Sequence, residues 1–93
     1  MRDEISRSMK DALKAGDKIA LSTIRLIAAA LKDRDITARG NGVSEGISDD
    51  EILSMLQTMI KQRRESSAMY RDAGRSELAE TEEKEIKIIQ EFL

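Results

Sequence analysis

Three charged residues interrupt the apolar faces expected in the second half of the chain, and their types are suited to chemistry. Arg63 falls within an apolar arc, and Glu82 and Glu85 fall on the apolar face of the following helix. A buried charge needs a partner or a shifted pKa. Paired carboxylates can perform acid–base catalysis, but a neighbouring arginine favours their ionised forms. We therefore expect Arg63 to form a structural ion pair with Glu82 or Glu85, and we expect no catalytic residue.

The composition removes several other kinds of site. The chain contains no cysteine and no histidine. It therefore has no thiolate nucleophile, no cysteine-based zinc site and no imidazole, the commonest general base near neutral pH. We expect neither a metal nor a cofactor.

Basic residues on the outward faces are candidates for contacts with nucleic-acid phosphates. They recur at helical spacing on the expected second and third helices, and they could form one surface if the helices bring them together. The alternative is an ordinary solvated face, where the long basic side chains cover apolar flanks. Few aromatic residues are present, so base stacking on a single strand is not expected. The candidate phosphate contacts are Arg25, Lys32, Lys61, Arg64, Arg71 and Arg75.

Four helices must position these residues. Apolar residues recur at three- and four-residue intervals in four stretches, about 2–15, 18–38, 48–73 and 76–93. Gly16 and Gly74 mark short turns, and Ser48 with Glu51 matches a capping box. The three glycines between residues 40 and 46 follow a helix, so we interpret them as a surface loop. The sequence predicts an all-α domain made of two helical hairpins.

Length and charge place further bounds on the protein. Ninety-three residues allow one domain, 1–93. The net charge is −2, so a nucleic-acid interface would have to be local. No apolar run is long enough to span a membrane, and the first residues do not resemble a secretory signal. We expect a cytoplasmic protein that does not engage membranes.

Several segments resemble a known family over essentially the whole chain. They are Ile24–Lys32, Ile60–Ser66, Tyr70–Arg75 and Glu82–Leu93. Together they resemble the YqeY proteins, which are related to the C-terminal region of the GatB subunit of tRNA-dependent amidotransferases. The resemblance implies a small helical domain that corresponds to the N-terminal part of the family, and we expect the family's second small helical domain to be absent from this chain.

The resemblance also implies a function. In the amidotransferases the related region engages tRNA, while carbon–nitrogen ligation with glutamine as amide donor takes place elsewhere. We therefore expect a non-catalytic module that engages tRNA, and the ligase activity enters only by family association. The alternative is a protein–protein adaptor or a homodimer that docks through the apolar end of the last helix, at Ile89, Phe92 and Leu93.

Overall fold

The computed structural model describes residues 1–93 and contains four α-helices and no strand. The helices are α1 (Arg2–Ala15), α2 (Lys18–Gly40), α3 (Asp49–Asp72) and α4 (Ser76–Gln90). The all-α prediction is confirmed. α2 continues to Gly40, beyond the expected end at 38, and α4 ends at Gln90, short of the expected 93.

Local signals account for where the helices begin and end. Gly16 ends α1 in the left-handed conformation, with φ of 68°, where a residue without a Cβ is favoured. The Asp17 carboxylate then accepts a hydrogen bond from the Ala20 amide and caps α2. At the start of α3, Ser48 and Glu51 form the expected capping box. These signals fix the short turn between α1 and α2 and the entry into α3.

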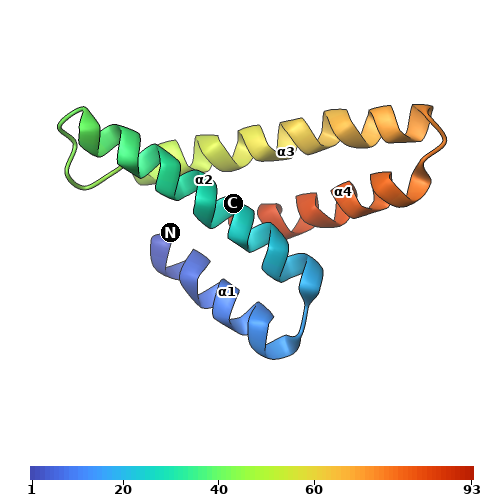
Figure 1. Cartoon of the computed structure of the whole chain (residues 1–93), viewed down its shortest axis with the longest axis horizontal. Helices are drawn as coiled ribbons and strands as arrows, with labels where there is room; N and C mark the ends of the chain where they lie inside the picture. Colours follow the sequence, from blue (N-terminus) through green and yellow to red (C-terminus); the bar gives the residue numbers. More distant parts are fainter.

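Two antiparallel hairpins, α1–α2 and α3–α4, make up the molecule (Figure 1). α2 packs against all three other helices, as expected for the helix with the widest apolar arc. The molecule measures 47 × 30 × 18 Å, and the α3–α4 turn projects at one end of its longest dimension (Figure 1). The core draws on all four helices, and its completely buried side chains include Ile27, Ile52, Met55, Leu56 and Ile89.

The end of α4 differs from the expectation of an exposed apolar surface. Ile89 is completely buried and Phe92 is 8% exposed, whereas Leu93 is 54% exposed. Phe92 joins the same core cluster as Ile5 and Ile24, so the last turn of the chain packs against the α1–α2 hairpin. The expectation of an exposed apolar chain end was wrong for Ile89 and Phe92 because the sequence pattern shows an apolar face without showing what covers it.

Candidate nucleic-acid interface

The two expected phosphate contacts on α2 belong to a longer row. Arg25 and Lys32 are both exposed, and Lys18 and Arg39 extend the row at the same seven-residue interval. A seven-residue interval is about 10.5 Å along a helix, and two turns return nearly to the same face. We call Lys18, Arg25, Lys32 and Arg39 the α2 ridge. It follows α2 from its first residue to the residue before its last.

A shallow groove of about 260 Å³ between α1 and α2 adjoins this ridge. Lys32 and Arg39 line it from α2, and Met9 lines it from α1. The one carboxylate in the lining is Asp35, which is engaged in an ion pair with Arg2. None of the four cations of the α2 ridge lies within ion-pair distance of a carboxylate, because the molecule's three ion pairs involve Arg2, Arg63 and Arg71.

The four expected contacts on α3 and the following turn have different surroundings. Lys61, Arg64 and Arg75 are exposed and have no ion-pair partner. Glu65 follows Lys61 by four residues and shares its outer face. Arg71, in contrast, is committed to Glu83 on α4.

The Arg71–Glu83 pair is bidentate. Arg71 Nη2 lies 2.7 Å from Oε1 and 2.8 Å from Oε2 of Glu83, and Arg71 Nε lies 3.0 Å from Oε1. The Ser67 hydroxyl donates to the same carboxylate at 3.2 Å. The hydrogen bonds from Arg71 are the largest cause that lowers the pKa of Glu83 below its usual range. A guanidinium held in this way has fewer donors left for a phosphate.

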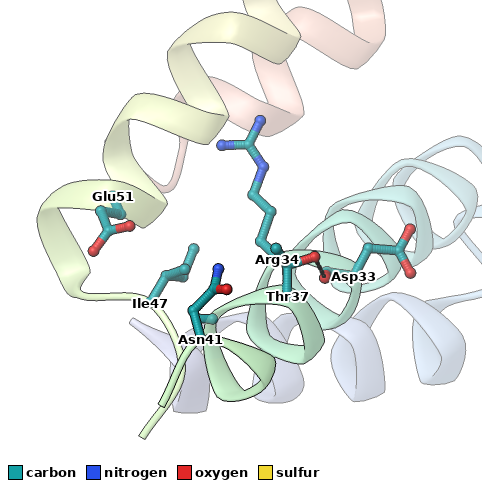
Figure 2. A pocket seen from close by; sticks show the side chains of 7 residues that line it. Asp33, Arg34, Thr37, Asn41, Ile47 and Glu51 are labelled. Carbon is teal, nitrogen blue, oxygen red and sulfur yellow. Dashed lines mark hydrogen bonds between the residues drawn. The ribbon is translucent and has the colours of Figure 1, made fainter. Parts of the chain in front are cut away.

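Two pockets lie on different flanks of α2. Lys32 lines the groove beside α1, whereas Arg34 and Thr37 line a separate pocket of about 410 Å³ against the start of α3. In this pocket, Thr37 donates to the Asp33 carbonyl at 3.1 Å, and Arg34 extends into the angle between α2 and α3 (Figure 2). α2 therefore separates the flank that carries Arg25 and Lys32 from the flank that faces α3.

The charged residues inside the α3–α4 hairpin form an ion pair. Arg63 Nε donates to Glu85 Oε2 at 2.8 Å, and Arg63 Nη1 donates to the Met59 carbonyl at 3.1 Å. The two charged side chains are 13% and 19% exposed. Glu82 accepts no hydrogen bond from Arg63, and its pKa is raised, first by burial and then by the neighbouring Glu85 charge. Arg63 is therefore paired with Glu85, and Glu82 is a neighbour of the pair without being hydrogen-bonded to Arg63.

A second buried ion pair was missed by the sequence analysis. Arg2 binds the Asp35 carboxylate with both of its terminal nitrogens, and its Nη2 also donates to the Ile47 carbonyl at 2.8 Å. Asp35 in turn accepts the Ile47 amide at 2.9 Å. Hydrogen bonding to Arg2 is the largest cause that lowers the pKa of Asp35. These contacts tie the start of α1, the end of α2 and the loop before α3 together.

Two features point to this pair, a spacing in the sequence and a close backbone approach in the structure. Asp35 continues the apolar face of Ile24 and Leu31 at helical spacing, which marks it as a buried charge in need of a partner. Gly46, with φ of 83°, passes directly over the pair, and an added Cβ would lie 2.3 Å from Asp35 Oδ1. The identity of the partner was not predictable, because Arg2 lies 33 residues away.

Two further features concern metals and membranes. The structure contains no cluster of three or more carboxylates that could hold a metal ion. None of the four helices combines the length and the apolar composition required to cross a membrane.

The fold defines a small all-helical domain, with ion pairs between its helices and unpaired cations on its surface. The model of the YqeY-like protein family matches residues 2–93, and the chain belongs to this family. The resemblance noted in the sequence is thereby confirmed.

Curated relatives agree with this assignment. The protein named altered inheritance of mitochondria protein 41, mitochondrial, from Lachancea thermotolerans is 32% identical over 96% of this chain and 46% of its own length. Its namesake from Vanderwaltozyma polyspora is 29% identical over the same shares. An uncharacterized protein from Schizosaccharomyces pombe is 28% identical over 96% of this chain and 68% of its own length. The chain thus spans about half the length of the first two relatives.

The names of these relatives correct the expected location. The proteins from Lachancea thermotolerans and Vanderwaltozyma polyspora are both named as mitochondrial, which contradicts the expectation of a cytoplasmic protein. That expectation rested on the lack of a secretory signal, and such a lack does not specify a compartment.

Proposed function

We propose that this domain is a non-catalytic helical module that binds tRNA through its phosphate backbone. The observation that carries the proposal is that the surface holds exposed cations without carboxylate partners on two elements. The candidates for phosphate contacts are Lys18, Arg25, Lys32 and Arg39 on α2, and Lys61, Arg64 and Arg75 on α3 and the turn after it. Unpaired lysine and arginine side chains are free to replace the counterions of a polyanion, which is the main source of affinity in backbone binding.

The choice of tRNA among polyanions rests on the resemblance to the GatB region. In an amidotransferase-like assembly, this domain would contribute RNA contacts while amide transfer takes place on other domains or subunits. The charged residues inside the hairpin agree with that division, because Arg63 and Glu85 are paired with each other and make no open site. The unpaired cations support the binding role that we propose.

The adaptor alternative depended on an exposed apolar chain end. Burial of Ile89 and Phe92 leaves Leu93 as the exposed large apolar side chain at that end. A single exposed leucine is ordinary for a protein surface and does not define a docking site. We therefore favour RNA binding over docking through the end of α4.

A titration of the 93-residue chain with total tRNA at two salt concentrations tests the proposal. Backbone binding must weaken steeply as salt rises, because released counterions drive it. Binding that is insensitive to salt, or no binding at low salt, would contradict the proposed function.

A further inference from the structure

The rows of cations on this molecule are not equivalent, and their neighbouring carboxylates distinguish them. On α1, Asp3 and Asp11 lie one helical turn from Arg7 on either side. On α3, Glu65 lies one turn from Lys61, and Arg71 is paired with Glu83. The carboxylates of these rows partly cancel the attraction of the cations for an anionic ligand.

The α2 ridge has no such competition. The one carboxylate three or four residues from Lys32 and Arg39 is Asp35, and its charge is satisfied by Arg2 and by the Ile47 amide. Asp33 directly follows Lys32 in the sequence, but consecutive residues of a helix point about 100° apart and do not face each other. At the start of the ridge, the Asp17 carboxylate caps the helix at the Ala20 amide. Four formal positive charges therefore follow one another along one flank of α2.

The dimensions of the α2 ridge suit a rigid, extended polyanion. From Lys18 to Arg39 the row spans 21 residue steps of helix, or about 31 Å, which is close to one helical turn of a nucleic-acid duplex. A continuous helix holds the four backbone positions in a straight line. The broad, shallow minor groove of an RNA duplex exposes backbone to such a surface.

The apolar residues near the α2 ridge do not form a competing patch. Ile5 and Leu31, which line the groove, are 3% and 8% exposed, so they offer little further surface to a partner. Three large apolar side chains of this hairpin are exposed, Leu13 at the end of α1, Leu26 in the first half of α2 and Ile36 near the end of α2, so they are spread along its length. Apolar side chains that are scattered beside a continuous row of cations favour a ligand that is recognised by its negative charge.

Aromatic side chains are lacking as well. The chain has one tyrosine and one phenylalanine, and the phenylalanine, Phe92, is buried in the core. Binding of single strands depends on aromatic platforms for successive bases, and the α2 ridge offers none.

Resting on the proposed function, we infer that the α2 ridge is the RNA-binding surface, that it takes the backbone of a double-helical segment, and that the basic residues of α3 are not part of it. The ligand class is therefore a duplex region of RNA, such as a tRNA stem. Recognition is independent of sequence, because phosphates carry no base information.

Two charge-reversal variants with identical net charge test this inference. Arg25→Glu/Lys32→Glu reverses the centre of the α2 ridge, and Lys61→Glu/Arg64→Glu reverses the outer face of α3. Each changes the formal net charge from −2 to −6, so any difference between them reports position and not the overall field. All four side chains are exposed and none is in an ion pair.

The probes are an RNA hairpin whose stem is about one helical turn long, a tRNA transcript and a single strand of equal length, titrated by fluorescence anisotropy at several salt concentrations. Four backbone contacts predict a slope of log affinity against log salt of roughly −3 to −4 for the hairpin. We expect the α2 variant to lower the magnitude of the slope by ~2 and to weaken binding by tenfold or more, on the order of 1.4 kcal/mol for each factor of ten. We expect the α3 variant to bind within about twofold of the unmodified chain.

Each alternative outcome overturns a distinct part of the inference. Equal weakening by both variants, or greater weakening by the α3 variant, refutes the α2 ridge and leaves the proposed function intact. Equal affinity for the single strand refutes the duplex. Displacement of the RNA hairpin by an acidic helical peptide at the same total negative charge refutes RNA in favour of an acidic protein segment. The absence of salt-dependent binding to every RNA probe refutes the proposed function itself.

Circular dichroism checks that each variant is folded. Arg25→Gln/Lys32→Gln replaces the α2 variant if the charge reversal unfolds the chain.

Discussion

At the scale of single residues, charges inside this small domain are held by specific partners. Arg63 and Glu85 are both largely removed from water, and the buried Asp35 is paired with the partly exposed Arg2. Both pairs are hydrogen-bonded within the chain. No buried side-chain polar atom lacks a partner. Buried pairs contribute little net stability when intact but are costly to break, since one charge is then left without its partner. Changes at these residues therefore give direct tests.

Replacement of Arg63 by methionine should leave the Glu85 carboxylate unpaired while preserving much of the side-chain volume. We expect a loss of about 2–3 kcal/mol in the free energy of unfolding, toward the lower end for buried pairs because both side chains retain some exposure. Urea denaturation followed by circular dichroism measures it. The double variant Arg63→Met/Glu85→Leu should recover most of the loss, and a single variant as stable as the parent would show that the pair does not matter.

Replacement of Asp35 by asparagine should remove the charge that Arg2 binds and keep an acceptor for the Ile47 amide. We expect a loss of about 2 kcal/mol at neutral pH. Because the pKa of Asp35 is lowered in the folded state, its contribution is present above the unfolded pKa of about 4 and is lost as pH falls through the folded value. The difference between parent and variant should therefore shrink in acid. Denaturation curves at neutral pH and below pH ~3 measure this, and a constant difference would contradict it.

At the scale of the elements, one loop determines how the two hairpins are connected. The residues between α2 and α3 close over the Arg2–Asp35 pair, and Gly46 makes that close approach possible. α1 thereby contributes to the position of α3 although the two helices do not pack against each other. The loop that the sequence marked only as a glycine-rich surface segment is, at Gly46, buried and structural.

Two glycine-to-alanine changes in this loop separate backbone strain from packing. Gly42 and Gly46 both have positive φ, 91° and 83°, but only at Gly46 would a Cβ collide with other atoms. We expect Gly42→Ala to cost about 1 kcal/mol, from conformation alone. Gly46→Ala should cost about 2–4 kcal/mol because the Asp35 carboxylate must also move. Thermal and urea denaturation of both variants measure this, and equal losses would show that the collision is relieved without cost.

At the scale of the whole molecule, the charge is divided between the two hairpins. Residues 1–46 carry nine basic and seven acidic residues, and residues 47–93 carry seven and eleven, which gives +2 and −4. The more acidic hairpin also uses two of its arginines in internal pairs. The RNA-facing side that we propose therefore lies on the hairpin with the positive balance, and the near-neutral total conceals it.

The burial of Ile89 and Phe92 predicts the oligomeric state of the isolated chain. With these side chains inside one subunit, no large apolar patch remains at the end of α4 to drive self-association. We expect a monomer of 10.4 kDa by sedimentation equilibrium, and we expect Leu93→Ser to leave the mass unchanged. A dimer that Leu93→Ser dissociates would contradict this packing.

The sequence alone determined the four helices and most of their boundaries, because helix signals act over three or four residues. Ser48 and Glu51, Gly16 and Asp17, and the apolar periodicity are all local. The row of cations on α2 could be predicted in the same way, since a single helix places residues seven apart on one face. The identification of buried charges at Arg63, Glu82 and Glu85 followed from interruptions of that same periodicity.

Only the tertiary structure decided which charges meet and which faces are covered. The choice of Glu85 over Glu82, the capture of Arg71 by Glu83, and the Arg2–Asp35 pair depend on how helices far apart in the sequence lie against each other. The burial of Phe92 in the core has the same origin. Periodicity specifies the face on which a residue lies but not what packs against that face, and the docking of one hairpin on the other supplies that information.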